Sequence, residues 1–208
     1  IYAQLKTGAA GNLTVENKDK IEISIKDSIG IYAQNETGDD NRIAVTNEKD
    51  IVSTSNADGA IGIMAKQSKV TNAAAGKIEL EGKTSVGIFG KKGSEITNSG
   101  NINATNNAAD SKSVGIISDK GTAVNTGNIT MAGGGSAGML GQNGATLTNS
   151  GSVTMNGEKS AGIYTENSTS SNEGTVTVTG KESAGMFAKN SSADNYNITN
   201  KGTINLNT

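Results

Sequence analysis

Ser160-Ala-Gly-Ile-Tyr-Thr165 is one copy of a six-residue phrase whose recurrence determines the fold prediction. The other copies are Ser28-Ile-Gly-Ile-Tyr-Ala33, Ala60-Ile-Gly-Ile-Met-Ala65, Ser85-Val-Gly-Ile-Phe-Gly90, Ser113-Val-Gly-Ile-Ile-Ser118, Ser136-Ala-Gly-Met-Leu-Gly141 and Ser183-Ala-Gly-Met-Phe-Ala188. The opening Ile1-Tyr2-Ala3-Gln4 matches the end of a further copy. The central glycines are spaced by 32, 25, 28, 23, 24 and 23 residues, so the basal repeat unit has 23 to 24 residues.

A second motif, an Asn preceded by a short β-compatible stretch, lies about ten residues after most copies of the phrase. Its asparagines are Asn72, Asn98, Asn125, Asn149, Asn172 and Asn200. A Gly and a short alternating run follow, as in Gly151-Ser-Val-Thr-Met155 and Gly174-Thr-Val-Thr-Val178. Alternation of apolar, mostly β-branched, residues with polar residues is typical of a strand with one buried face. Each repeat therefore predicts three short strands separated by turns.

Three short strands cannot bury a face alone, so the repeats must stack on one another. We predict an all-β fold, a right-handed parallel β-helix (β-solenoid) of about eight coils of 23 to 32 residues with three short strands per coil, forming a single segment over residues 1–208. Insertions at residues 36–41, 104–112 and 191–196 are expected to project as loops.

Two recurrent residue types are assigned structural roles. The phrase glycines are interpreted as structural turns: Gly30, Gly62, Gly87, Gly115, Gly138, Gly162 and Gly185. The recurrent asparagines are expected at another turn, where stacked amides form a ladder between coils and the residue type tolerates a left-handed backbone.

The composition excludes several kinds of chemistry. The 208 residues contain no His, Cys, Pro or Trp, which rules out His-dependent catalytic triads and dyads, His zinc ligands and disulfides. A net charge of −2 gives no reason to expect nucleic-acid binding, and no metal or cofactor is expected. No apolar run approaches the ~20 residues of a membrane-spanning helix.

The six-residue phrase also predicts a candidate binding surface. If Ile31, Ile63, Ile88, Ile116, Met139, Ile163 and Met186 face inward, the residue after each faces outward. That outward column is Tyr32, Met64, Phe89, Ile117, Leu140, Tyr164 and Phe187. An exposed apolar stripe of this length would be a contact surface and the candidate ligand-binding site. The alternative is a bend at the phrase, with both residues pointing partly inward.

The Ser-Ala-Gly-Ile-Tyr-Ala type of phrase, followed by Ile-Thr-Asn-Ser-Gly and an alternating strand, resembles the passenger β-helix of large type V autotransporter adhesins of the fusobacterial type. The resemblance covers essentially the whole chain. It implies non-enzymatic display at a Gram-negative cell surface and attachment to a host cell-surface protein or glycan, or to partner bacteria. The absence of a signal peptide and of barrel strands predicts a segment of a longer passenger, anchored in the outer membrane by a barrel outside this chain.

Two alternative functions stay open. Parallel β-helices also include polysaccharide lyases and hydrolases, which need paired carboxylates or clustered acidic calcium ligands with a basic proton acceptor. The densest candidate is Gly38-Asp39-Asp40-Asn41-Arg42, for which a solvated turn is the favoured interpretation. The third possibility is a pure structural spacer with no ligand of its own. Whether the segment is the tip or the stalk of the passenger stays open at this point.

Overall fold

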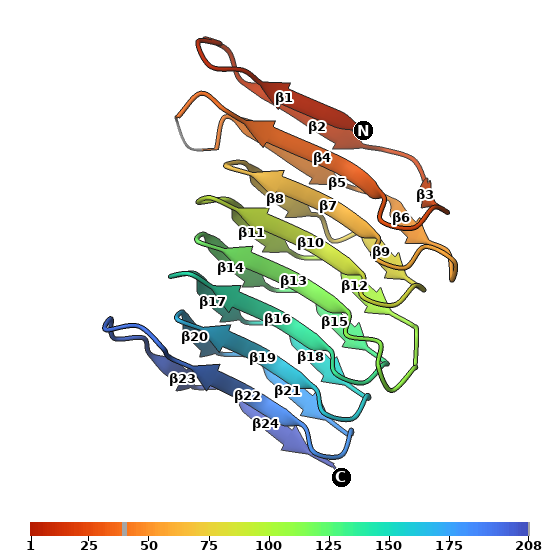
Figure 1. Ribbon diagram of the computed structural model, residues 1–208, viewed down its shortest axis with the longest axis vertical. Coiled ribbons are helices and arrows are strands. Elements are labelled where there is room, and N and C mark those ends of the chain that lie inside the picture. Colours follow the sequence, from red (N-terminus) through yellow and green to blue (C-terminus); the bar gives the residue numbers. More distant parts are fainter. Residues whose placement is uncertain (39–40, 208) are drawn as a thin grey trace.

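The computed structural model, which describes residues 1–38 and 41–207, consists of short parallel strands wound into one solenoid (Figure 1). Three sheets run along its length. Sheet A contains β1 (Tyr2–Leu5), β4 (Ile29–Asn35), β7 (Ile61–Lys66), β10 (Val86–Lys91), β13 (Val114–Asp119), β16 (Ala137–Gln142), β19 (Ala161–Glu166) and β22 (Ala184–Lys189). Sheet B contains β2 (Leu13–Asn17), β5 (Ile43–Asn47), β8 (Lys69–Asn72), β11 (Glu95–Asn98), β14 (Thr122–Asn125), β17 (Thr146–Asn149), β20 (Thr169–Asn172) and β23 (Ile198–Asn200). Sheet C contains β3 (Ile21–Ile23), β6 (Asp50–Ser53), β9 (Lys77–Leu80), β12 (Asn101–Ala104), β15 (Asn128–Met131), β18 (Ser152–Met155), β21 (Thr175–Val178) and β24 (Thr203–Leu206).

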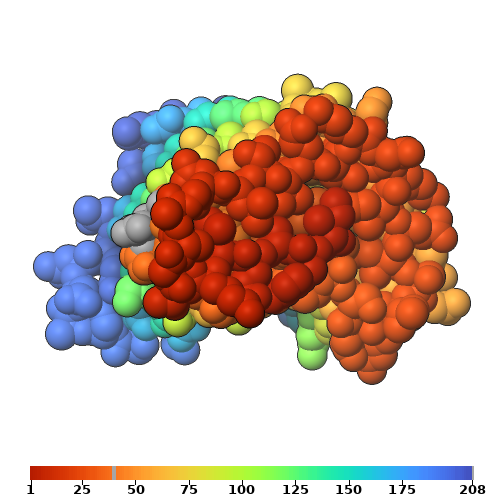
Figure 2. Space-filling view, turned by 90° about the horizontal axis from the view of Figure 1, so that it is seen from above, coloured from red at the N-terminus to blue at the C-terminus, as the bar shows by residue number. Residues whose placement is uncertain are grey.

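Each coil contributes one strand to each sheet, and every strand pairs in parallel with its counterparts in the coils before and after it. The predicted right-handed parallel β-helix of eight coils with three strands per coil is therefore confirmed. Viewed along the axis, the coils lie behind one another from the N-terminal to the C-terminal end (Figure 2). Equivalent side chains consequently form columns parallel to the axis.

The core is built from these columns. On sheet A, Ile31, Ile63, Ile88, Ile116, Met139 and Ile163 are fully buried, while Met186 in the last coil is partly buried. Sheets B and C add inward aliphatic residues such as Val70, Ile96, Ile102 and Ile129. The predicted inward face of the phrase is thus confirmed, and burial of these side chains supplies most of the stabilisation.

The phrase glycines are not turns, and this part of the prediction was wrong. Gly30, Gly62, Gly87, Gly115, Gly138, Gly162 and Gly185 each occupy the second residue of a sheet A strand. The glycine and the following Ile or Met both face inward, so the strand bends there and the alternation breaks. A Cβ at Gly115 would lie 2.6 Å from Gly138 O and 2.7 Å from Ile129 Cγ2. Close approach of backbone and core, rather than backbone conformation, therefore requires glycine at this column.

The asparagines form the predicted ladder, at the last residue of each sheet B strand. From Asn47 to Asn200, each Asn accepts a hydrogen bond from the Nδ2 of the Asn one coil before it, at 2.7–2.8 Å. Asn17 and Asn47, which the sequence prediction omitted, extend the ladder through all eight coils. None of these asparagines has a positive φ, so the expected left-handed backbone is not the reason for their recurrence.

Left-handed backbone occurs elsewhere, at both corners that flank sheet A: directly after the strand, at Gln67, Lys92, Lys120, Asn143 and Asn167, and directly before the first residue of the phrase. Asp27, Thr84, Lys112, Lys159 and Glu182 have φ between 52° and 56°, and Gly59 and Gly135 occupy the same place in the other coils. At the corner before the phrase, each non-glycine residue holds a backbone conformation that costs about 1–3 kcal/mol, whereas Gly59 and Gly135 adopt it without a steric penalty.

The insertions leave the stack as loops, as predicted. Residues 105–113 join β12 to β13, and residues 190–197 join β22 to β23, while the predicted insertion at residues 36–41 lies partly outside the described residues. The core columns continue without interruption past each loop.

Candidate functional site

The candidate site is the outer face of sheet A, where the predicted column points away from the core. We call it the stripe: Tyr32, Met64, Phe89, Ile117, Leu140, Tyr164 and Phe187. These residues are directly paired from coil to coil. Six of them are half-buried because the neighbours above and below cover them, and Phe187 in the last coil is 49% exposed. The stripe residues therefore face outward, as the first of the two alternatives predicted. At the bend of each strand, only the phrase glycine and the residue directly after it face inward.

Aromatic contacts hold parts of the stripe in order. The Tyr164 and Phe187 rings are stacked, with centroids 5.3 Å apart and planes 18° apart. At the other end Tyr2, which the prediction did not include, continues the stripe, and its ring lies 5.5 Å from that of Tyr32. The Lys91 ammonium lies 4.5 Å from the centroid of the Phe89 ring. Desolvation raises the pKa of the Tyr32 phenol, with smaller contributions from Tyr2 and Glu36, so this hydroxyl stays neutral at physiological pH.

A second outward column lies beside the stripe and changes size along the axis. Its members, paired from coil to coil, are Ile29, Ile61, Val86, Val114, Ala137, Ala161 and Ala184. The first four are β-branched, and the last three are alanines. Loss of the branched side chains lowers the surface of β16, β19 and β22 relative to the stripe. The change from β-branched residues to alanine is visible in the sequence. Its meaning could be recognised only once the structure showed that this column faces outward.

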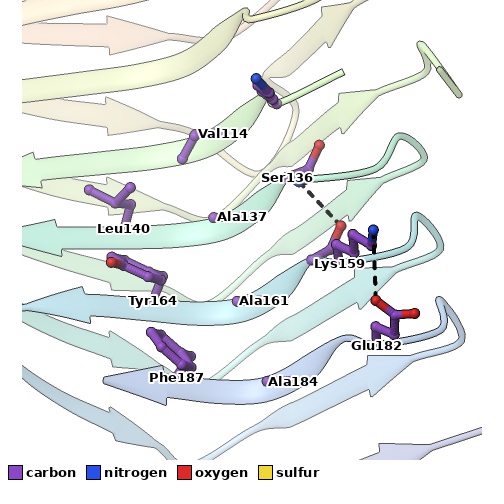
Figure 3. A pocket seen from close by; sticks show the side chains of 13 residues that line it. Val114, Ser136, Ala137, Leu140, Lys159, Ala161, Tyr164, Glu182, Ala184 and Phe187 are labelled. Atoms are coloured by element: carbon purple, nitrogen blue, oxygen red, sulfur yellow. Dashed lines mark hydrogen bonds and ion pairs between the residues drawn. The ribbon is translucent and has the colours of Figure 1, made fainter. Parts of the chain in front are cut away.

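The alanines form the floor of a groove of about 570 Å³ (Figure 3). Leu140, Tyr164 and Phe187 form one wall. The opposite wall is the turn that precedes each sheet A strand and carries Lys112, Lys159 and Glu182. Lys159 Nζ lies 3.7 Å from Glu182 Oε2, so the rim has one paired cation and a further lysine in Lys112. The groove thus combines an apolar floor and aromatic wall with a net positive rim.

The wall of turns is ordered by serine hydroxyls. Ser136 N donates to Ser160 Oγ at 3.2 Å, drawn as the dashed line from Ser136 in Figure 3. Ser160 N in turn donates to Ser183 Oγ at 2.9 Å. Because each hydroxyl satisfies a backbone N–H of the coil before it, the turns are held in register. The groove is therefore preformed rather than assembled from mobile loops.

The second candidate site, Gly38-Asp39-Asp40-Asn41-Arg42, contributes no residue to the groove. Asp39 and Asp40 lie outside the described residues. Arg42 donates to Ala9 O at 2.8 Å and to Asn12 Oδ1 at 3.5 Å, so it ties the start of β5 to the segment of residues 6–12 that precedes β2. Within residues 1–38 and 41–207, no group of three or more His, Cys, Asp or Glu is placed to hold a metal ion. The same residues include no helix of the length and hydropathy needed to span a membrane.

Comparison with known families agrees with this architecture. The family model described as the BigA third pectate lyase-like domain matches residues 1–168 and, in a second overlapping match, residues 118–208. The chain belongs to this family. A BigA third pectate lyase-like domain is a β-helix domain of a bacterial surface protein, which fits the solenoid seen here. No curated protein and no solved structure is matched by the chain.

Proposed function

We propose that this BigA third pectate lyase-like domain is an extracellular, passenger-type segment of a Gram-negative outer-membrane surface protein and that it attaches cells to their targets. The targets are a host cell-surface protein or glycan, or partner bacteria. The observation that carries the proposal is the stripe with its groove, an apolar and partly aromatic surface that continues through all eight coils.

The contrast between the faces of the solenoid supports this choice. The equivalent outward positions of sheet B are mostly hydroxyl residues, such as Thr71, Thr97 and Thr148, and those of sheet C include Thr130 and Thr154. Polar outward columns keep a sheet face soluble, whereas a contiguous apolar patch indicates a contact surface. A fibrous stack of coils also holds the groove away from the membrane, which suits attachment at a distance.

The experiment is saturable binding of the labelled chain to epithelial cells, immune cells and partner bacteria. Replacing Tyr164 and Phe187 by Ser removes the aromatic wall and is expected to reduce binding at least tenfold, a loss of about 1.4 kcal/mol or more. A variant with Thr148→Ala and Thr154→Ala, on the other two faces, is the matched control and should bind normally. Equal binding by both variants, each with an unchanged circular dichroism spectrum, would contradict a role for the stripe.

Polysaccharide cleavage is the second candidate, because the family is described as pectate lyase-like. Lys112 and Lys159 at the groove rim are the groups that would approach an acidic sugar, with Glu182 as the neighbouring carboxylate. We propose binding without catalysis, since this rim offers one carboxylate rather than the pair that hydrolysis requires. Incubation with polyuronates should release neither unsaturated nor reducing ends. Release that is lost in Lys159→Met would overturn the proposal in favour of a lyase.

A further inference from the structure

Positive charge is concentrated along one edge of the solenoid, where three consecutive coils turn from sheet A to sheet B. We call the five lysines of this edge the lysine cluster: Lys66, Lys69, Lys91, Lys92 and Lys120. They lie at or beside the turns from β7 to β8, from β10 to β11 and from β13 to β14, which follow one another along the solenoid (Figure 1). The same segments contain two carboxylates, Glu95 and Asp119, so positive charges exceed negative charges by three, although the whole chain has a net charge of −2.

The ammonium groups of the lysine cluster are not neutralised by the nearby carboxylates. Within the described part of the chain, seven other lysines form ion pairs, but none of these five does. The two local carboxylates accept hydrogen bonds from amides instead. Asp119 Oδ1 accepts from Asn143 Nδ2 at 2.7 Å, and Glu95 Oε1 accepts from Asn41 Nδ2 at 2.8 Å. The cluster therefore presents uncompensated positive charge.

The positions of these lysines are unfavourable for the stability of the scaffold. Lys66 and Lys91 are directly paired in sheet A, and like charges at directly opposed positions destabilise a sheet. Lys92 and Lys120 hold left-handed backbone, with φ of 54° and 58°, which Asn adopts more readily than Lys. Because both arrangements reduce stability, the charges serve a purpose other than coil stacking.

The next two coils show that the scaffold does not require charge at these places. The left-handed residue after the sheet A strand is Asn143 in one coil and Asn167 in the other, with φ of 58° and 49°. The first residue of the sheet B strand, in the column of Lys69, is Thr146 and then Thr169. Neutral side chains thus maintain the same corner, which makes the lysine cluster a local feature of three coils.

The spacing of the cluster favours an extended anion over a small one. Successive paired strands are about 4.8 Å apart, so Lys66 and Lys91 form one short row of ammonium groups parallel to the axis. Lys92 and Lys120, which follow adjacent strands, form a second row beside it. A single small anion would meet only part of this surface, whereas a chain with closely spaced anionic groups would meet both rows.

An apolar surface adjoins the ammonium groups. The stripe residues Met64 and Phe89 lie two positions before Lys66 and Lys91 in the same strands, so they share the outward face of sheet A. Lys91 Nζ lies 4.5 Å from the centroid of the Phe89 ring, a contact that orders an ammonium without removing its charge. The C–H faces of sugar rings pack against apolar side chains of this kind while their anionic substituents reach the lysines.

We propose that the lysine cluster is a binding site for a sulfated glycan, with sulfates on the two rows of ammonium groups and a sugar ring against Phe89. A polyuronate has only its carboxylates to offer, whereas a sulfated glycan carries sulfates in addition and matches the denser charge. Lysine meets an anion as a point charge, which suits sulfates that project in different directions. The site shares no residue with the groove and binds its ligand independently of it.

The test variant is Lys92→Asn/Lys120→Asn, which places at both corners the residue type of the next two coils. Its binding of a heparin hexasaccharide, measured by calorimetry at low ionic strength, should be weaker by roughly tenfold or more, and its urea midpoint should rise. The matched control, Lys26→Asn/Lys49→Asn, removes two exposed lysines that form no ion pair with a described residue, and it should bind like the unmodified chain. Equal binding by the two variants, or a lower urea midpoint of the test variant, would overturn the proposal.

The choice of ligand tests the sulfate requirement. A desulfated heparin hexasaccharide and a hexagalacturonate should each bind the unmodified chain more weakly than the heparin hexasaccharide by roughly tenfold or more. Binding of either one, or of a short DNA duplex, as tight as that of the heparin hexasaccharide would overturn the assignment to a sulfated glycan.

The proposal can fail separately from the function proposed for the stripe. The variant with Tyr164 and Phe187 replaced by Ser loses the groove wall but keeps the lysine cluster, so it should bind the heparin hexasaccharide normally. An unmodified chain that attaches to cells yet does not bind the hexasaccharide would overturn the lysine site and leave the stripe in place.

Discussion

Removing one asparagine from the middle of the ladder should destabilise the fold by an amount that can be counted from its bonds. Asn125 accepts from Asn98 Nδ2 at 2.7 Å and donates to Asn149 Oδ1 at 2.8 Å, and all three side chains are fully buried. Asn125→Ala leaves one N–H of Asn98 and the Oδ1 of Asn149 without these partners. At about 2 kcal/mol for each orphaned buried group, the expected loss in free energy of unfolding is about 4 kcal/mol.

The double variant separates this explanation from simple loss of volume. Asn149→Ala alone orphans one N–H of Asn125 and the Oδ1 of Asn172, again about 4 kcal/mol. In Asn125→Ala/Asn149→Ala, the Nδ2 of Asn125 and the Oδ1 of Asn149, which bond to each other, are both removed. Only Asn98 Nδ2 and Asn172 Oδ1 are then left without their ladder partners. The pair should therefore cost about 4 kcal/mol rather than 8, a coupling of about 4 kcal/mol.

Urea unfolding followed by circular dichroism measures this cycle, with constant m-values as the check on two-state behaviour. Asn72→Ala combined with Asn149→Ala is the matched control, because the two sites share no ladder partner, and their costs should add to within about 0.5 kcal/mol. If the adjacent pair is as additive as the distant pair, the ladder does not stabilise the fold through its hydrogen bonds and the reasoning is refuted.

Two further predictions concern single groups. Ser118 Oγ and Thr165 Oγ1 are buried without a hydrogen-bond partner among the described residues. Removing each hydroxyl, by Ser118→Ala or Thr165→Val, should therefore raise the free energy of unfolding by about 1 kcal/mol, measured as a higher urea midpoint. A lower midpoint would contradict this prediction. The Lys83 ammonium, 2.8 Å from Asp110 Oδ1, lowers the pKa of that carboxyl through a hydrogen bond and then through charge. The contribution of this ion pair to the free energy of unfolding is complete above the ordinary pKa of Asp and is lost as pH falls through the lowered pKa. In Lys83→Met, an NMR titration should show the Asp110 pKa returning upward. An unchanged Asp110 pKa would exclude the ion pair as the cause of the shift.

The coil plan could be predicted because each strand type carries its own pattern. The alternation in Gly151-Ser-Val-Thr-Met155 gives β18, and the phrase Ser160-Ala-Gly-Ile-Tyr-Thr165 gives β19 with Ile163 inward and Tyr164 outward. Asn17 and Asn47 could also have been found, since Val-Glu-Asn17 and Val-Thr-Asn47 follow the pattern of Val-Thr-Asn72. They were missed because the surrounding insertions obscure the spacing in the first two coils.

The role of the glycines could not be predicted from composition or spacing. A glycine that recurs beside strands is most often read as a turn. Gly115 instead lies inside β13, and its requirement comes from Gly138 O in the next coil and Ile129 in another sheet. Those atoms are 23 and 14 positions away along the chain, so only the stacked structure brings them to the site.

The groove shows how such a scaffold can change function without changing fold. The inward columns and the Asn ladder determine coil stacking, and both continue without a break through the coils that contain β13, β16, β19 and β22. The groove arises from one outward column, where Val114 gives way to Ala137, Ala161 and Ala184 beside a wall that ends in Tyr164 and Phe187. Because these outward positions contribute little to the core, they are free to vary in size and charge, whereas the inward positions are not. Specific recognition can therefore be placed on any coil of a solenoid of this kind, and it should be sought where an outward column changes rather than where the repeat is most regular.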